Sequence, residues 1–340
     1  MPVSVDRAAS SAPLAEEPGK SRNRGWKTVV ESYALLVLLG VVIVVFSIAE
    51  PDSFATKGNF VTILQQESVL VCVCLGLILP IAVGEFDLSI GYVAGFSAIL
   101  AAALGGDTGI AGGIVVPVVI LCGLAIGTIN GFLVARVKVH SLIATLGVGF
   151  AVSALATGIS GANVIFEGIP KLIPTLTSTS VLGLRTAVWI VAAFAVAMYV
   201  VLTFTPFGKK IYAVGGSEKV SRMAGIRTDL VKIAAFAICG GFAATAGMLN
   251  LGQAGSANPS YGPALLLPAF VAVFLGATTI KPGVFNVWGT IVAILLLATA
   301  FSGLGLVGVP LWIQPLFEGL LLLGGVVFAR TEARSLGRSA

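Results

Sequence analysis

The feature that most constrains this chain is a succession of ten apolar windows of about 20 residues, separated by short polar breaks. A helix of that length spans the hydrocarbon core of a bilayer. The windows fall at residues 28–48, 61–83, 88–104, 110–134, 139–160, 186–204, 231–251, 263–279, 284–302 and 310–328. The pattern predicts an all-α, polytopic membrane protein with about ten transmembrane helices. Because only a glycine and charged break separates the second and third windows, nine or eleven helices are alternatives.

The composition excludes a soluble protein of this size. Hydrophobic residues make up 57% of the 340 residues and charged residues 10%, against about 45–50% and 25% in soluble domains. A soluble globule could not cover so much apolar volume with so little polar surface, whereas lipid-facing helices need no such cover. The 42 glycines agree with this, because small residues let helices in lipid approach closely.

The first apolar window resembles a signal peptide, because Arg22, Arg24 and Lys27 precede it. However, it is longer than the apolar core of a signal peptide, and no A-x-A cleavage site follows. An uncleaved first transmembrane helix is therefore expected. The sequence predicts a disordered cytoplasmic tail at 1–27, a transmembrane domain at 28–329 and a second cytoplasmic tail at 330–340.

The distribution of lysine and arginine predicts the orientation. With ten spans and a cytoplasmic N-terminus, only Lys57, Lys171 and Arg185 lie outside, and the other 17 of the 20 cations lie inside. The positive-inside rule predicts such an excess of cations on the cytoplasmic side. An arrangement with one central span fewer would not show it. Both termini are therefore expected in the cytoplasm. Topology accounts for the basic excess, so no nucleic-acid partner is expected.

Residues for metal binding or catalysis are scarce. The four cysteines lie inside apolar runs without metal-ligand or CxxC spacing, and the single histidine, His140, opens a span as an interfacial residue. The motifs GxSxG, HExxH and GxxxxGK[ST] are absent from the sequence. We therefore expect a protein that is not an enzyme and has no metal or cofactor. If ATP drives its activity, another subunit must bind it.

The longest inside loop, residues 205–230, has a pattern of its own. Gly215 and Gly216 break the chain, Ser217 is a candidate N-cap, and Glu218 stands in the first turn, where the helix dipole favours an anion. Apolar residues follow at helical spacing up to a stop at Gly225. This predicts a short amphipathic helix that docks a partner, with a solvated linker as the alternative.

Acidic residues at membrane depth are costly and often functional, and four of them lie in or beside apolar runs: Glu67, Glu85, Asp87 and Glu318. Glu85 and Asp87 belong to a segment that Gly84 and Gly91 interrupt. Irregular backbone at this depth must be buried in protein or line water. The segment is therefore either a pathway or hinge element, or a turn in which Asp87 caps the next helix.

Ion coupling is not favoured, because the windows 231–251, 263–279 and 284–302 carry almost no ionisable side chain beyond their ends. Neutral polar and aromatic side chains remain in or near the spans, such as Gln66, Gln314 and Phe86. They suit a polyhydroxylated neutral solute and equally suit hydrogen bonds between helices.

Four segments resemble the permease subunits of bacterial ATP-binding-cassette sugar importers, in the ribose, xylose and galactose branch. They are GEFDLSIGYVAG at 84–95, NGFLVARVKVHSLIATLG at 130–147, TPFGKKIYAVGGSEKVSRMAGI at 205–226 and FLGATTIKPGVFNVWGT at 274–290. They occur in the family's order within residues 28–329. Glu85 departs from the pattern, since the family has a second glycine there.

The resemblance implies a vitamin-B12-importer-like (type II) permease fold in the bacterial inner membrane. It also implies a second permease copy, a cytoplasmic ATPase that binds ATP and magnesium, and a periplasmic or lipid-anchored solute-binding protein. The expected function is import of a neutral monosaccharide or polyol; the alternatives are a nucleoside importer or an ion-coupled secondary transporter. Candidate residues for coupling to the ATPase are Ser217, Glu218, Arg222 and Gly225. Candidate pathway or hinge residues are Gly84, Glu85, Asp87, Ser89, Gly91, Asn130 and Thr145.

Overall fold

The computed structural model of the chain describes residues 24–106, 110–310 and 312–335. Each predicted apolar window coincides with one helix or with a pair of helices. These helices are α1 (Arg24–Ala49), α2 (Lys57–Ala82), α3 (Ile90–Gly106), α4 (Gly112–Ala135), α5 (Ser141–Ser160), α7 (Thr186–Phe204), α10 (Thr228–Ala254), the pair α11 (Tyr261–Ala264) and α12 (Leu266–Gly276), α13 (Val287–Leu306) and α14 (Ile313–Ser335).

Six helices are long and apolar enough to cross a membrane, judged by length and composition: α2, α4, α5, α7, α10 and α13. Within the described part of the chain, the apolar portions of the other windows are shorter. The architecture is therefore that of a mostly helical, multi-pass membrane protein.

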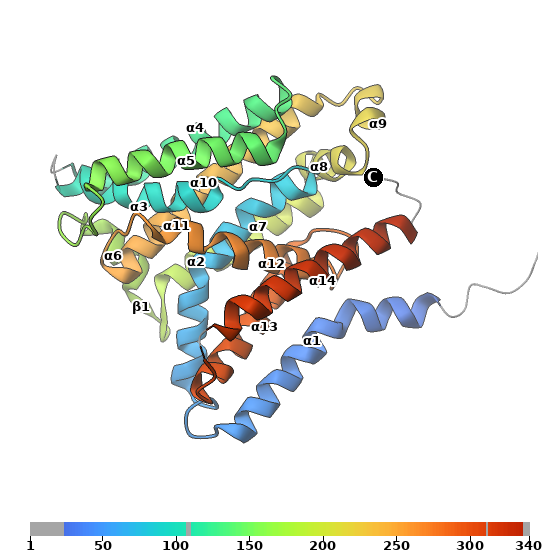
Figure 1. Ribbon diagram of the computed structural model, residues 1–340, viewed down its shortest axis with the longest axis horizontal. Helices are drawn as coiled ribbons and strands as arrows, with labels where there is room; N and C mark the ends of the chain where they lie inside the picture. Colours follow the sequence, from blue (N-terminus) through green and yellow to red (C-terminus); the bar gives the residue numbers. More distant parts are fainter. Residues whose placement is uncertain (1–23, 107–109, 311, 336–340) are drawn as a thin grey trace, which may run out of the picture.

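The helix α10 lies at the centre of the molecule and packs against α4, α2 and α3 (Figure 1). Glycine makes the closest of these approaches possible. A β-carbon on Gly240 of α10 would overlap the carbonyl of Gly123 on α4, and one on Gly247 would overlap the carbonyl of Ala94 on α3. The glycine content of the sequence thus serves helix packing, as expected for helices in lipid.

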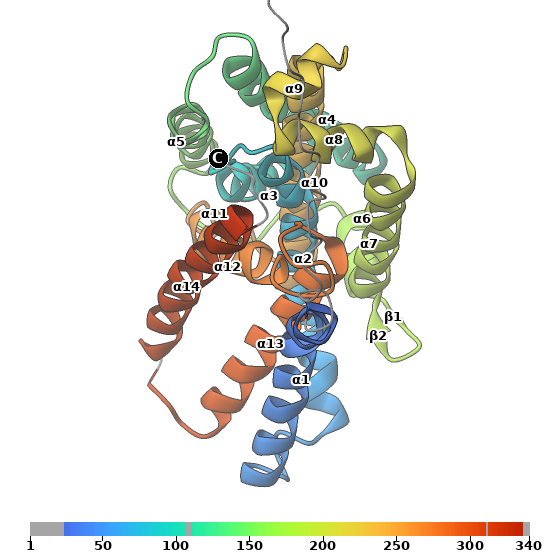
Figure 2. The same cartoon turned by 90° about the vertical axis from the view of Figure 1, so that its right-hand side faces the viewer.

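Two short helices, α8 (Pro206–Gly216) and α9 (Glu218–Met223), mark one end of the molecule. The beginning of α1 and the end of α14 lie toward this same end, on the right of Figure 1, which faces the viewer in Figure 2. The helix α6 (Leu172–Ser178) and the strands β1 (Ser180–Val181) and β2 (Leu184–Arg185) lie away from it.

The expectation of an all-helical chain needs a small correction, because β1 and β2 form an antiparallel hairpin. Leu182 and Gly183, the two residues of its turn, both have positive φ, at 54° and 82°. This is the type I′ geometry that matches the twist of paired strands. The hairpin belongs to the connection at 161–185 and leaves the helical architecture unchanged.

The expectation of a continuous helix over 263–279 is wrong, because the chain is interrupted at Leu265 between α11 and α12. Pro268 explains the break. A proline inside a helix lacks its N–H donor, and its ring clashes with the carbonyl of the residue four positions earlier, which here is Ala264.

Both expected tail boundaries lie inside helices, since α1 begins at Arg24 and α14 runs to Ser335. The remainder of the expected tails, residues 1–23 and 336–340, lies outside the described residues.

Candidate functional site

The segment 205–230, expected as a loop with one short helix, contains two helices before α10 begins. Thr205 caps α8 by accepting a hydrogen bond from the Gly208 N–H at 3.3 Å, and Pro206 occupies the first helical position, where its missing donor costs nothing. The Thr-Pro pair was the sequence signal for this helix, and our sequence reading missed it.

The predicted break at Gly215 and Gly216 is also wrong, because both residues belong to α8 and the helix ends at Ser217. Gly215 has a different reason to be glycine. A β-carbon there would overlap the carbonyl of Ala82, so Gly215 lets the end of α8 pack against the end of α2.

The short helix α9 has the caps that the sequence predicts. The Ser217 hydroxyl accepts a hydrogen bond from the Val220 N–H at 3.3 Å. Gly225 has a φ of +82°, a conformation in which a β-carbon is costly. The apolar side chains of Val220 and Met223 are 58% and 73% exposed. The helix thus presents an uncovered apolar surface within an ordered, capped element.

An ion-pair network surrounds α9. Glu218 and Arg222 stand four positions apart on α9, and the Arg222 guanidinium donates to Glu218 Oε1 at 2.8 Å. It also donates to Asp229 Oδ1, at 3.0 Å, near the start of α10. Lys138, between α4 and α5, lies 3.4 Å from Asp229 and 3.8 Å from Glu218. The network therefore ties α9 to α10 and to the α4–α5 connection.

These cations perturb Glu218 itself. A hydrogen bond from the Lys232 ammonium lowers the pKa of Glu218; desolvation opposes this, and the charges of Lys232 and Lys138 reinforce it. Glu218 is therefore an anion throughout the neutral pH range.

The second candidate region, between α2 and α3, is a turn held by side chains. Gly84 begins it with a φ of +86°. Asp87 Oδ1 accepts hydrogen bonds from the Ser89 N–H at 2.9 Å and from the Ser89 hydroxyl at 2.6 Å. Asn130 of α4 donates from Nδ2 to Ser89 Oγ at 2.7 Å. Asp87 thus holds Ser89, the residue that precedes α3.

Two further contacts fix this turn on the neighbouring helices. Thr145 of α5 accepts a hydrogen bond from the Leu88 N–H at 3.1 Å. Gly91 at the start of α3 packs so closely on Gly262 that a β-carbon would overlap the Gly262 carbonyl. The structure therefore brings together the predicted residues from 84–91, α4 and α5.

The side chains of Asp87, Ser89, Asn130 and Thr145 are all buried, so here they contact one another and not a passage. This geometry is that of a turn held by buried side chains. Their functional role stays a prediction.

The two candidate regions meet at a residue that the sequence analysis counted only as an inside cation. Lys232 near the start of α10 donates from Nζ to Glu85 Oε1 at 2.6 Å and to Glu218 Oε2 at 2.7 Å. Its side chain is 8% exposed. The signal for such a pairing was absent from the sequence, because Glu85 and Lys232 lie far apart in the chain.

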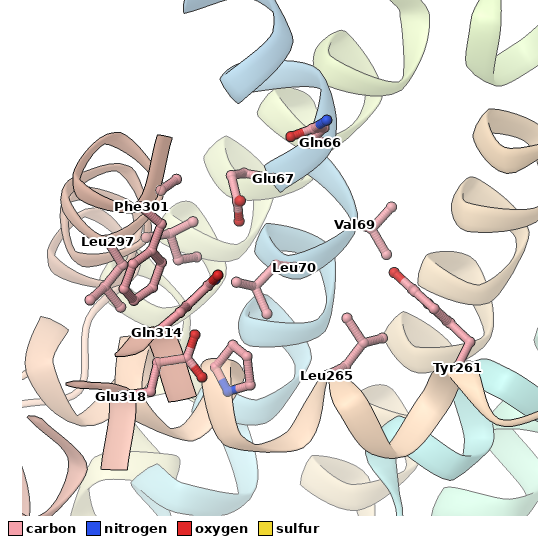
Figure 3. Close-up of a pocket in the computed structure, with 13 residues that line it drawn as sticks. Gln66, Glu67, Val69, Leu70, Tyr261, Leu265, Leu297, Phe301, Gln314 and Glu318 are labelled. Atoms are coloured by element: carbon pink, nitrogen blue, oxygen red, sulfur yellow. The ribbon is translucent and has the colours of Figure 1, made fainter. Parts of the chain in front are cut away.

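A cavity of about 220 Å³ lies between α2, α11, α12, α13 and α14 (Figure 3). Its polar lining residues are Gln66, Glu67, Tyr261, Gln314 and Glu318. The side chains of Glu67, Gln314 and Glu318 approach one another from α2 and α14 beside the ring of Phe301 (Figure 3). Two of the costly acids of the sequence thus face a common space with hydrogen-bonding neighbours.

Among the described residues, no group of three or more His, Cys, Asp or Glu side chains could hold a metal ion. The four cysteines are free, and His140 is exposed at the start of α5.

Comparison with known proteins decides the family. A family model described as "Branched-chain amino acid transport system / permease component" matches residues 59–326. The chain belongs to this permease family. The match begins within α2, ends within α14 and includes both candidate regions and the cavity.

Similar curated proteins are permease proteins of transport systems. The ribose import permease protein RbsC of Escherichia coli (strain K12) is 32% identical over 302 residues, which cover 88% of this chain and 93% of the relative. The L-arabinose ABC transporter permease protein AraH of Azospirillum brasilense is 29% identical, over 95% of this chain and 94% of the relative. The autoinducer 2 import system permease protein LsrC of Yersinia enterocolitica is 29% identical, over 90% and 82% respectively. No solved structure matches the chain.

These similarities confirm the family resemblance of the four sequence segments, all of which lie within residues 59–326.

Proposed function

We propose that this chain is the permease subunit of an ATP-binding-cassette importer that carries a neutral monosaccharide or polyol across the bacterial inner membrane. The observation that carries this proposal is the 32% identity to a ribose import permease along 88% of the chain. The arabinose permease supports the same class of solute. Neither relative's name supports nucleoside import or ion coupling, the two alternatives from the sequence.

The membrane arrangement that we propose has about ten spans in a type II permease fold. The six long apolar helices supply most of the spans, and α1, α3, α11–α12 and α14 supply the others. Both termini are assigned to the cytoplasm, because 17 of 20 cations then lie on that side. This orientation is supported because α9 lies toward the same end of the molecule as the beginning of α1 and the end of α14 (Figure 1).

The hydrolysis that drives transport takes place on a separate cytoplasmic ATPase, which binds ATP and magnesium. The sequence lacks a phosphate-binding loop, so the chain itself contributes no nucleotide site. A second permease copy and a periplasmic or lipid-anchored solute-binding protein complete the importer in this proposal.

The helix α9 is the proposed docking element for the ATPase. Coupling requires a surface that is cytoplasmic, ordered and partly apolar. The capped α9, with Val220 and Met223 exposed between charged residues, meets these requirements. Ser217, Glu218, Arg222 and Gly225 shape this element and are the proposed coupling residues.

The cavity between α2 and α14 is the proposed site of contact with the solute. Carboxylate and amide groups hydrogen-bond hydroxyl groups, and Phe301 offers an apolar face to a sugar ring. Its volume of about 220 Å³ is below that of drug-sized pockets, in keeping with a small solute.

Co-expression with a candidate ATPase and a candidate solute-binding protein, followed by reconstitution in liposomes, tests the proposal. We expect the permease to co-purify with the ATPase, and hydrolysis to rise when the binding protein is loaded with ribose or arabinose. Stimulation by a nucleoside instead of these sugars would favour the first alternative. Transport driven by an ion gradient without any ATPase would favour the second.

A further inference from the structure

Three segments of the chain, one of them more than 130 positions before the other two, meet at one buried ammonium group. Lys232 Nζ is 2.6 Å from Glu85, in the turn before α3, and 2.7 Å from Glu218, at the start of α9. The side chain of Lys232 is 8% exposed, whereas those of Glu85 and Glu218 are 17% and 35% exposed. The pairing therefore lies partly beneath the surface, where salt screens it little.

The Lys232 ammonium needs both carboxylates. A buried charge is tolerated when it is paired and its donors are satisfied, and two of the three N–H donors of Lys232 are used here. Glu218 has further cationic partners in Arg222 and Lys138. Among the described residues, by contrast, the only ion pair of Glu85 is the one with Lys232. The position of Glu85 thus depends on Lys232 more than that of Glu218 does.

The turn that contains Glu85 is also hydrogen-bonded to α4 and α5. Its Leu88 N–H donates to Thr145 of α5, and Ser89 accepts from Asn130 of α4. A displacement of α9 that pulls Glu218 would therefore reach α3, α4 and α5 through Lys232, Glu85 and this turn. A contiguous chain of contacts of this kind can carry coupling, although only an energetic measurement demonstrates it.

We propose that Lys232 is a positioning residue that transmits movement of α9 to the turn at 84–89 by holding Glu85 and Glu218 together. The inference rests on the proposed docking of the ATPase at α9 and adds the link between that docking and the membrane helices.

The test compares Lys232→Met, Glu85→Gln and the double variant, each assembled with the ATPase and binding protein in liposomes. Methionine matches the apolar part of the lysine side chain up to Cε and removes the ammonium group. We expect each variant to retain the ATPase, because the Val220 and Met223 surface is unchanged. In Lys232→Met, sugar-stimulated hydrolysis should fall about tenfold relative to the basal rate, within the range expected for contacting charges. Glu85→Gln should show a smaller fall, and the double variant should be no worse than Lys232→Met alone.

A matched control and a second readout separate transmission from general damage. Lys138→Met removes another cation beside Glu218, but one that is 54% exposed, and should leave the stimulated-to-basal ratio within about twofold. Hydrogen exchange at 86–90 should change when the ATPase docks on the wild type, and should not change when it docks on Lys232→Met. This readout needs no transported solute.

The outcomes distinguish the two proposals. If the wild type recruits no ATPase, the proposed function fails and the inference fails with it. If the ATPase docks but Lys232→Met retains wild-type stimulation and the wild-type change in exchange, the inference alone is overturned. Losses in the single variants that simply add in the double variant would also overturn it.

Discussion

Replacing Asp87 by alanine removes the acceptor that holds the residue before α3. In the wild type, Asp87 Oδ1 accepts from the Ser89 N–H at 2.9 Å and from the Ser89 hydroxyl at 2.6 Å, and the Asp87 side chain is buried. Each buried donor left without a partner costs about 1–3 kcal/mol. The two donors, however, are not equally affected.

The hydrogen of the Ser89 hydroxyl can rotate about the Cβ–Oγ bond and find another acceptor. The Ser89 N–H is fixed by the backbone and has no such alternative. The free energy of unfolding of Asp87→Ala should therefore be lower by about 1–3 kcal/mol, which is the cost of leaving one buried donor, and not two, without a partner. Asp87→Asn keeps an acceptor oxygen in the same position and should lose less than about 1 kcal/mol.

The assay is the melting temperature of the purified permease, read together with its yield and its transport in liposomes. One kcal/mol corresponds to about 2–4 °C in domains of 150–250 residues, so Asp87→Ala should melt a few degrees lower and transport more slowly. Ser97→Ala is the matched control. Ser97 on α3 is also buried, but its hydroxyl has no partner within the described part of the chain, so its removal should not lower the melting temperature. A wild-type melting temperature for Asp87→Ala, or an equal fall in the melting temperature of Ser97→Ala, would refute this role of Asp87.

The remaining predictions concern docking, orientation, pH and the cavity. Gly225→Val should insert normally but lose ATPase co-purification and sugar-stimulated hydrolysis, because its φ is +82°; Gly216→Val, where a β-carbon meets open space, should retain both, and equal behaviour of the two would contradict the role of Gly225. A topology reporter fused after Arg330 should read as cytoplasmic, and a periplasmic signal would overturn the ten-span arrangement. Because the pKa of Glu218 is lowered, the stabilisation from its ion pairs is complete above the usual carboxylate range and is lost only as the pH falls through the lowered pKa. The ratio of sugar-stimulated hydrolysis in the wild type to that in Glu218→Gln should therefore be constant between about pH 6 and 8. A variation of this ratio in that range would count against an ionised, ion-paired Glu218. Glu318→Leu should slow sugar transport at saturating binding protein without changing ATPase recruitment, and unchanged transport would remove the cavity from the proposed passage.

The sequence by itself determined the class of fold, because the length and spacing of apolar windows follow directly from the thickness of a bilayer. It also determined the local structure of α9. The cap at Ser217, the positive φ at Gly225 and the pair of Glu218 with Arg222 depend on residues at most a few positions apart, so a short pattern suffices to predict them.

Local patterns failed where a distant part of the chain decides the outcome. Gly215 and Gly216 suggested a break, but Gly215 is glycine because α2 lies against it.

Two other features did have local signals that apolar periodicity alone does not detect. These are the interruption at Leu265, signalled by Pro268, and the helix α8, signalled by the Thr-Pro pair.

Only the tertiary structure decided how the candidate residues combine. The sequence proposed a turn at 84–91 and a docking helix near 217–225 as separate features, and both were drawn from neighbouring residues. Lys232 joins them because helix packing brings the start of α10 between Glu85 and Glu218, which no pattern along the chain encodes. Likewise, Glu67 and Glu318 face one cavity because α2 and α14 cross beside it, although 251 positions separate them in the chain.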